Sequence, residues 1–398
     1  MRVTRTLRAT VGAALTGALL LTAGATASAD QVRKEQWPLE AFGAEQLWKE
    51  ATGKGVTVAV LDSGFRETHQ DLKGQFLPEP DFGKRNEAEA AKHLKPGEHD
   101  VRDHGTAMAS IIAGHGHGPG GSEGVKGLAP DAKILPVPEY GSSGQATRWA
   151  VDHGADVINM SYGGAGQAGD ECASIAYALS KGVVVVAGVG NDATTGRTYP
   201  VGCPGAIGVG AVDQYGAAAE FNNYNSDTDL LAPGVKITVA SGTSDTGYDR
   251  AAEGSSDATA YVSATAALLK QKFPGLTPGQ IANRLVKTAG LAQPQKAKHL
   301  NLPDPHYGYG FLQPGPALRK TLAAGPKEGP LPMPKGADTA TPSGANQGED
   351  AGQSSDNATH NALLYGGIGV GALVVVGAVV ALVASARRRK NAGGQARG

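Results

Sequence analysis

The middle of the chain alternates short apolar runs with stretches of helical periodicity. The apolar runs are rich in valine and isoleucine and lie at 55–61, 133–137, 157–160 and 183–186. Continuous apolar runs of this length are typical of strands that are buried on both faces of a parallel sheet. Helical stretches lie between or after them, at 104–114, 147–153 and 173–181. This alternation predicts an α/β fold with a mostly parallel β-sheet and helices on both faces.

A later helix has the clearest start signal in the chain. Thr277 is placed as N-cap, Pro278 occupies the first turn, and Gln280 completes a capping box. We expect this helix to end near Gly290 and to pack on the outside of the domain.

Three polar residues lie where predicted strands end or predicted helices begin. Asp62 ends the run 55–61, His104 opens the helical stretch 104–114, and Ser256 opens a further helical run. A serine hydroxyl becomes a strong nucleophile when an imidazole takes its proton, and a fixed carboxylate holds that imidazole in one tautomer. The order Asp, His, Ser along the chain is that of the subtilisin arrangement. Together these residues predict a catalytic triad for peptide-bond hydrolysis.

Stabilisation of the oxyanion requires at least two donors. A serine at a helix N-terminus directs its backbone N–H toward the developing charge, which the helix dipole also favours. Asn191 follows the run 183–186 and is placed to supply a side-chain amide, an interaction worth roughly 3 to 4 kcal/mol of barrier in such sites.

Several motifs, in this order along the chain, resemble those of the subtilisin-like (S8) serine proteases. They are Asp62-Ser63-Gly64 with His69 and Asp71-Leu72, His104-Gly105-Thr106, the edge-strand segment Ser161-Tyr162-Gly163-Gly164, and Gly190-Asn191. The resemblance covers roughly 36–315. It implies a subtilisin-like fold, peptidase activity with Asp62, His104 and Ser256 as catalytic residues, Asn191 at the oxyanion, and substrate binding along Ser161, Tyr162, Gly163 and Gly164.

The serine motif departs from the pattern usual in that family, Gly-Thr-Ser-x-Ala-x-Pro. Here Ser255 replaces threonine, Asp257 adds a negative charge beside the nucleophile, and Ala260 replaces proline. Loss of the proline is expected to loosen the helix start. Ser255 is an alternative nucleophile, although the spacing to Ala258 favours Ser256. The altered motif also motivates a competing hypothesis, a catalytically silent scaffold subunit of a secretion complex.

The two ends of the chain predict export and anchoring. Residues 1–29 have three arginines, an apolar stretch and Ala-Ser-Ala, the anatomy of a secretory signal peptide. Residues 362–386 are uncharged and long enough to cross a bilayer, although a buried core helix is the alternative. The basic tail 387–398 is expected in the cytoplasm, with the catalytic domain outside the plasma membrane.

The remaining segments complete the predicted organisation. We expect an N-terminal strap at 30–52, a peptidase domain at 53–324, and a disordered tether rich in Pro, Gly and Ser at 325–361. This layout resembles the mycosins, membrane-anchored subtilisin-like proteases of type VII secretion. The resemblance implies exported protein or peptide substrates and contact with secretion components. The charged insertion 73–100 is either a solvated loop or a substrate gate.

Cysteine content and charge narrow the remaining options. Cys172 and Cys203 are the two cysteines, and in an exported chain they are expected to form a disulfide, with free buried thiols as the alternative. The net charge of −1 argues against nucleic acid as a partner. His115 and His117 have no third metal ligand nearby in the sequence, so we expect both to face solvent and to bind no metal. No cofactor is expected, and the sequence does not decide whether the protein binds calcium.

Overall fold

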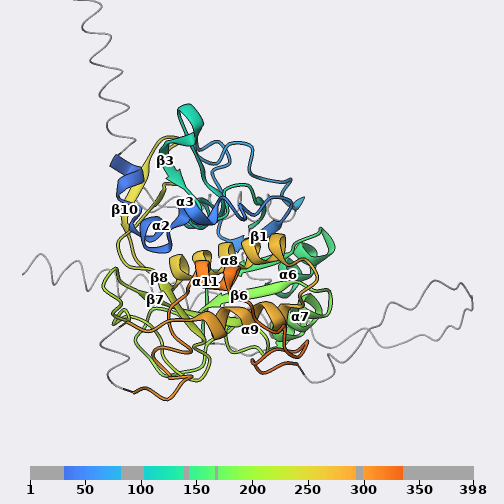
Figure 1. Cartoon of the computed structure of the whole chain (residues 1–398). Coiled ribbons are helices and arrows are strands. Elements are labelled where there is room, and N and C mark those ends of the chain that lie inside the picture. The colour runs from blue at the N-terminus through green and yellow to red at the C-terminus, as the bar shows by residue number, and fades with distance from the viewer. Residues whose placement is uncertain (1–30, 82–102, 139–142, 166–168, 293–298, 335–398) are drawn as a thin grey trace, which may run out of the picture. The chain divides into compact units, whose positions relative to one another are not determined.

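A six-stranded parallel sheet forms the centre of the molecule, in the order β4-β1-β5-β6-β7-β8 (Figure 1). The computed structural model describes residues 31–81, 103–138, 143–165, 169–292 and 299–334. The strands are β1 (Thr57–Asp62), β4 (Lys133–Pro138), β5 (Val157–Met160), β6 (Val184–Gly188), β7 (Ile207–Val212) and β8 (Leu230–Pro233). Two hairpins accompany them, β2 (His115–His117) with β3 (Glu123–Lys126) and β9 (Ile237–Ala240) with β10 (Tyr248–Ala252).

Both faces of this sheet are buried, because alternate side chains of each strand enter different hydrophobic clusters. Val58 and Val60 of β1 join one cluster, whereas Ala59 and Leu61 join the other. The helices are α2 (Trp37–Phe42), α3 (Ala44–Leu47), α5 (Asp103–Ala113), α6 (Ser143–Asp152), α7 (Gly169–Ser180), α8 (Ser255–Lys272), α9 (Pro278–Thr288) and α11 (Pro314–Arg319).

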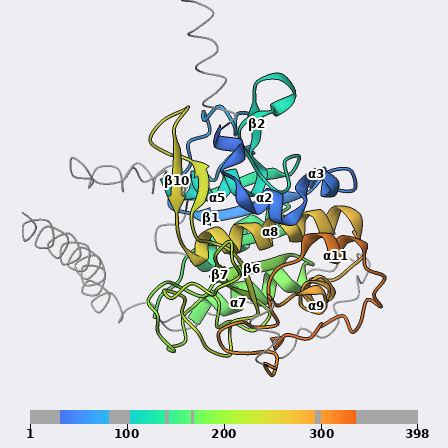
Figure 2. The same cartoon turned by 60° about the vertical axis from the view of Figure 1, so that its left-hand side comes forward.

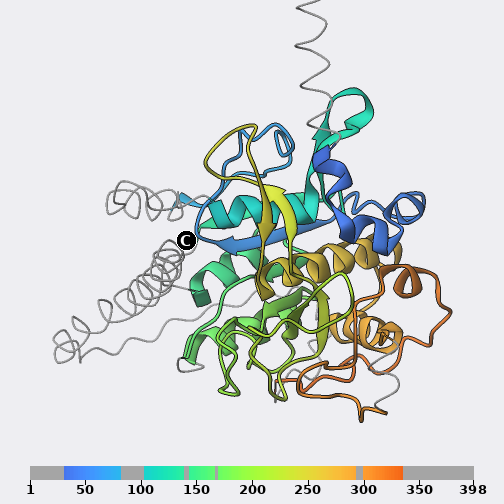
Figure 3. The ribbon, with the colours of Figure 1, turned by 90° about the vertical axis from the view of Figure 1, so that its left-hand side faces the viewer.

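The helices are divided between the two clusters. Apolar side chains of α5 and α8 belong to the first cluster, and those of α6 and α7 to the second. Helix α8 contacts most of the sheet strands, and α11 packs against it (Figure 2). The β9–β10 hairpin lies beside α5 (Figure 3). This arrangement confirms the predicted α/β fold with a mostly parallel sheet.

The capping box of α9 is present as predicted. The Gln280 backbone N–H donates to Thr277 Oγ1 at 3.2 Å, and the Thr277 N–H donates to Gln280 Oε1 at 3.1 Å. Pro278 stands in the first turn, and the helix ends at Thr288, two residues before the expected glycine.

The described N-terminal segment, 31–52, packs against the rest of the α/β domain. Leu39 and Leu47 enter the same cluster as α5 and α8, and the indole N–H of Trp48 donates to the Leu128 carbonyl at 3.0 Å. Arg33 donates to the carbonyls of the β2–β3 hairpin, including that of Gly124 at 3.0 Å. Apolar burial, together with hydrogen bonds from the Arg33 and Trp48 side chains to backbone carbonyls, therefore holds this segment against the domain.

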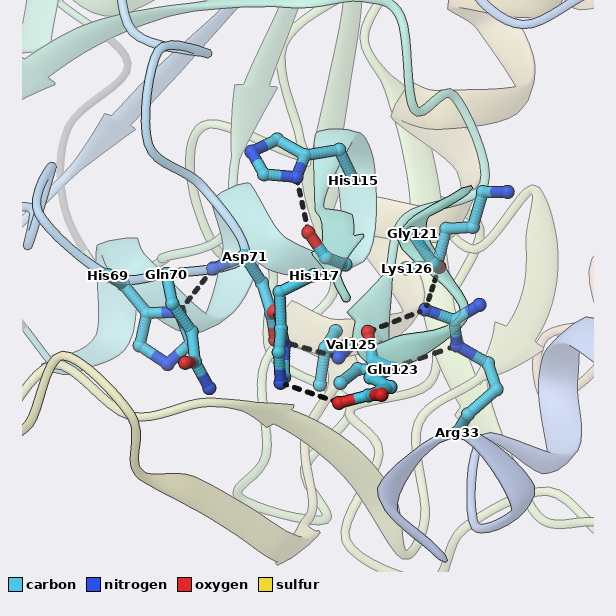
Figure 4. Close-up of polar contacts among 12 residues, drawn as sticks. Arg33, His69, Gln70, Asp71, His115, His117, Gly121, Glu123, Val125 and Lys126 are labelled. Atoms are coloured by element: carbon cyan, nitrogen blue, oxygen red, sulfur yellow. Dashed lines mark hydrogen bonds and ion pairs between the residues drawn. The ribbon is translucent and has the colours of Figure 1, made fainter. Parts of the chain in front are cut away.

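His117 of the same hairpin contacts a buried carboxylate, an interaction that the sequence did not indicate (Figure 4). Asp71 is fully buried; one of its carboxylate oxygens lies 2.6 Å from His117 Nδ1 and the other accepts from the Val125 N–H at 2.8 Å. His117 also lies 3.5 Å from a Glu123 oxygen. His117 was expected to face solvent; its side chain is 25% exposed, and a carboxylate 46 residues away in sequence holds its ring.

The packed domain extends beyond residue 324, where the sequence placed its end. Leu331 is buried and Met333 packs against the second cluster, while the Gly325 and Lys327 carbonyls accept hydrogen bonds from Gln280 and Thr277. Residues 325–334 therefore belong to the domain and not to a tether. The sequence prediction followed the high Pro and Gly content of this segment and overlooked its two apolar side chains that pack on the domain, Leu331 and Met333.

Several predictions fall on residues that the structure does not describe. They are the signal peptide 1–29, most of the tether 325–361, the membrane span 362–386, the tail 387–398 and most of the insertion 73–100. Within the described ranges, each helix is too short or too polar to span a bilayer.

A disulfide joins Cys172 on α7 to Cys203, 31 residues later. The loop that it closes contains β6 and Asn191. Both half-cystines contact the second hydrophobic cluster. The bridge therefore restrains the segment that presents Asn191.

We predict that replacing both cysteines with serine lowers the free energy of unfolding by about 3 to 4 kcal/mol, because the cross-link reduces the entropy of the unfolded chain. Urea unfolding of the full chain, followed by tryptophan fluorescence, measures this difference. Wild-type protein treated with a reductant should show the same loss. An unchanged urea midpoint in both samples would contradict the prediction.

Candidate active site

Asp62 and His104 are joined by a direct contact at the carboxyl end of β1. His104 Nδ1 lies 2.8 and 2.9 Å from the two Asp62 carboxylate oxygens. The carboxylate is further fixed because Asp62 Oδ1 accepts from the Ser63 N–H at 2.7 Å. A ring nitrogen that donates to a carboxylate carries the proton, so Nε2 is left to accept one. Asp62 is 6% exposed and His104 reaches the surface.

The start of α5 can approach β1 this closely because residue 105 is glycine. A Cβ at Gly105 would overlap the Gly64 carbonyl and would also press against Asp62 and Phe65. The backbone at 105 therefore packs directly on the loop after β1. This close approach sets the distance between His104 and its carboxylate.

Ser256 lies in the first turn of α8 and lines the same cavity as His104 and Asn191. Its hydroxyl donates to the Ser161 carbonyl at 3.0 Å, and the Ser161 hydroxyl donates to the Ser256 carbonyl at 2.9 Å. This reciprocal pair ties the end of β5 to the start of α8.

A buried polar network behind this pair was missed from the sequence. Ser263 donates to Asn159 Oδ1 at 2.9 Å, and Asn159 Nδ2 donates to Ser161 Oγ at 2.9 Å. Both Asn159 and Ser263 are fully buried. The available signal was the single amide within the apolar run 157–160. The network orients Ser161 and, through it, Ser256.

Ser255, the alternative nucleophile, faces away from the cavity. It is 2% exposed, and its hydroxyl accepts from the Gly190 N–H at 3.2 Å. Its own N–H donates to Asn191 Oδ1 at 2.8 Å. These contacts attach the Gly190–Asn191 turn to α8, so the geometry favours Ser256 as the nucleophile.

Asn191 is held so that its amide nitrogen can serve the cavity. Its oxygen is engaged by the Ser255 N–H, which leaves Nδ2 as the donor. Gly190 has a φ of 101°, a conformation that favours glycine, and Asn223 supports the turn by accepting from the Asp192 and Thr194 N–H groups. The Asn191 side chain and the N-terminus of α8 therefore border the same space.

The segment Ser161, Tyr162, Gly163 and Gly164 is not a regular strand in the structure. One antiparallel bridge joins Gly164 to Tyr199, with both N–H groups donating to the opposite carbonyls at 3.0 Å. The Tyr162 hydroxyl lies 2.7 Å from Ser143 Oγ. Gly163 and Gly164 are exposed, but the Gly164 N–H and carbonyl are already paired with Tyr199, so it is the Gly163 backbone that is accessible to an extended chain.

The cavity beside Ser256 has a volume of about 520 Å³ and is markedly acidic. In the described part of the chain, four carboxylates line it: Asp103, Asp249, Glu253 and Asp257. Desolvation of the His104 ring favours a lower pKa, but the negative charges of Asp62, Asp257 and Asp103 outweigh it and raise the pKa to about 9. Burial raises the pKa of Asp257 to about 7, against the opposing effect of His104, and Asp249 and Glu253 add to the rise.

The subtilase family model (Peptidase_S8) matches residues 53–310. The chain belongs to the subtilase family. Fervidolysin from Fervidobacterium pennivorans is 35% identical over 296 residues, covering 65% of this chain and 41% of fervidolysin. Subtilisin NAT from Bacillus subtilis subsp. natto is 35% identical over 60% of this chain and 61% of its own length. This subtilase therefore spans less than two thirds of either relative.

Solved structures show the same likeness. The crystal structure of fervidolysin, a keratinolytic enzyme related to subtilisin, aligns with a TM-score of 0.60 at 32% identity, over 72% of this chain and 46% of that one. MycP1 from Mycobacterium smegmatis aligns with a TM-score of 0.59 at 26% identity, over 74% of this chain and 87% of that one. A further MycP1 structure, from the ESX-1 type VII secretion system, matches with the same score and identity over 75% of this subtilase and 88% of its own chain.

We predict that Asn191→Ala lowers kcat by about 100- to 1,000-fold with little change in KM, because the lost donor acts on the transition state. Steady-state hydrolysis of a quenched peptide pool by the full chain measures both constants. Asn225→Ala, an asparagine that does not line the cavity, serves as the matched control. A loss below about threefold in Asn191→Ala would contradict an oxyanion role.

The charges around His104 predict an alkaline pH profile. A general base must be neutral, so kcat/KM should rise with pH through the raised pKa of His104, about 9. Asp257 is ionised at that pH, since its own pKa is about 7. Removing its charge in Asp257→Asn should lower the pKa of His104 and move the acid limb about half a unit to lower pH. Glu328→Gln is the control and should keep the wild-type profile. An acid limb at the same pH in Asp257→Asn and in wild type would contradict this prediction.

Proposed function

We propose that this subtilase is a serine endopeptidase that acts through an Asp–His–Ser triad and an acyl-enzyme intermediate. The observation that supports it most is the Asp62–His104 contact beside Ser256 at the edge of one cavity. The three side chains come from β1, α5 and α8, elements that are fixed in a common core. A rigid scaffold of this kind holds reacting groups in a productive geometry.

Each residue has a role in the proposed mechanism. Ser256 Oγ attacks the carbonyl carbon of the scissile bond, and its proton passes to His104 Nε2. Asp62 holds the Nδ1 proton and stabilises the imidazolium. Asn191 Nδ2 and the Ser256 N–H donate to the oxyanion. His104 then gives its proton to the leaving amine, and a water molecule, activated by the same imidazole, hydrolyses the acyl-enzyme.

The exposed backbone at Gly163, next to the bridge that joins Gly164 to Tyr199, supports binding of an extended peptide. An incoming chain would pair with this backbone by strand addition, the mode in which backbone hydrogen bonds supply affinity. Ser161 places the end of this segment next to the nucleophile through its two bonds with Ser256. The acyl part of the substrate would therefore lie along 161–164.

We further propose that the protein is anchored in the plasma membrane and faces outward. The signal-like segment 1–29, the uncharged segment 362–386 and the basic tail 387–398 support this placement. The structural likeness to MycP1 from the ESX-1 type VII secretion system supports a role in processing proteins of such a system. A chain anchored in this way would meet its protein substrates at the outer face.

A second candidate function is a catalytically weak or silent scaffold subunit. Two observations favour it: Asp257 raises the pKa of His104, and the Ser256 hydroxyl donates to Ser161 in this structure. Both would reduce activation of the nucleophile at neutral pH. In this alternative the protein has the same fold and the same proposed membrane anchor, but it does not hydrolyse peptide bonds.

Fluorophosphonate labelling of the full chain separates the two functions, because the probe reacts with activated serines. We predict labelling of wild type that increases from pH 7 to pH 9, is abolished in Ser256→Ala, and falls by at least about 1,000-fold in rate in His104→Ala. Ser255→Ala is the matched control and should retain labelling. A folded wild-type chain that stays unlabelled at pH 9 would support the scaffold.

A further inference from the structure

The acidic cavity beside Ser256 is separate from the segment 161–164. None of Ser161, Tyr162, Gly163 and Gly164 lines it, whereas His104 and Ser256 do. His104 must protonate the leaving amine, so the residue after the scissile bond lies on the His104 side. The cavity is therefore placed to receive the first side chain of the leaving peptide, given the proposed peptidase function on which this inference rests.

The charges of this cavity are one-sided. Asp103, Asp249, Glu253 and Asp257 line it, and among the residues that the structure describes its lining contains no lysine or arginine. Arg250, next to Asp249 in sequence, lies 3.2 Å from a Glu35 oxygen, so its side chain is engaged outside the cavity. Carboxylates that line one cavity repel one another when they are ionised. The arrangement therefore favours binding of a cationic group of a ligand.

One of these carboxylates also has an oxygen without a partner. Asp257 is 3% exposed, and its Oδ1 has no hydrogen-bond partner among the described residues. A buried carboxylate oxygen without a donor is unfavourable. A cationic group in the cavity would supply both the charge and the hydrogen bonds that the carboxylate lacks, and this second observation points to a ligand.

The remaining lining suits a long side chain that ends in a charge. Ala107, Met108, Val239, Ala240 and Ala252 supply apolar surface beside the carboxylates. Lysine and arginine bury their methylene stems on such surface while the charged group reaches acidic oxygens. A bare metal ion is a poorer fit, because no group of three or more suitable ligands is arranged to hold one in the described part of the chain.

We propose that this cavity selects substrates with lysine or arginine directly after the scissile bond. Glu253 and Asp249 are exposed and attract the cation, while Asp257 lies at the buried end. This selection concerns the leaving peptide. The acyl part of the substrate is bound by the segment 161–164.

The test compares quenched peptide pools that are randomised on the acyl side and carry lysine, acetyl-lysine or glutamate after the scissile position. Acetyl-lysine keeps the stem and removes the charge. We expect the full chain to cleave the lysine pool about tenfold faster, in kcat/KM, than the acetyl-lysine pool. The ratio should fall to about twofold in the double variant Glu253→Gln, Asp249→Asn, and should also fall in 1 M salt. Glu328→Gln, an exposed carboxylate outside the cavity, should keep the wild-type ratio.

A binding measurement keeps this proposal separate from the catalytic one. Ser256→Ala should bind a fluorescent peptide that begins with lysine more tightly than the same peptide beginning with acetyl-lysine, by fluorescence anisotropy. Equal cleavage of the two pools with intact labelling of Ser256 would overturn the selectivity and leave the peptidase intact. Absence of both labelling and cleavage, with preferential lysine binding retained, would overturn the peptidase and leave the cation site. Equal binding of both peptides would overturn the cation site.

Discussion

The packing of α8 against the parallel sheet is the constraint on which the site depends. Residues 257–269 of this helix are buried on all sides, which is possible because alanine, serine and threonine dominate its sequence. Two hydroxyls inside it are satisfied within the helix, as Thr259 and Thr265 donate to carbonyls four residues earlier. With its axis fixed in this way, the first turn of α8 has a single position relative to β1 and β5. Ser256 is therefore placed by the core of the domain, and His104 and Asn191 are brought to it by α5 and by the turn after β6.

The fold and the individual elements of the site could be predicted because both follow local patterns. Apolar runs define the buried strands, and Asp62 and Asn191 stand where such runs end. The links between elements could not be predicted in this way. The bond from Ser263 to Asn159 joins residues 104 positions apart, and the pair Asp71–His117 joins residues 46 apart. Such contacts depend on how helices and strands register in space, which no local periodicity encodes.

The end of the domain is a second feature that the sequence did not predict, because the prediction there relied on average composition. Composition favoured a disordered tether from residue 325, because proline and glycine dominate there. Two apolar side chains, Leu331 and Met333, were enough to keep ten further residues against the domain, aided by carbonyls that accept hydrogen bonds from α9. Average composition describes what a segment can bury in total. The position of a few anchors decides whether it packs.

The altered serine motif is best understood through Asp257, because this residue has two opposing effects on the chemistry. At the first turn of α8 its carboxylate is favoured by the helix dipole, yet burial disfavours its charge. When ionised, it stabilises the imidazolium form of His104, which lowers the fraction of neutral imidazole at neutral pH but supports the charge that develops as the serine proton is transferred. A cation in the adjoining cavity would offset the first effect, because it would neutralise part of the field at His104. In this view a basic leaving residue does more than fill the cavity: it brings the pKa of the general base closer to neutral pH in the same complex in which that base must act.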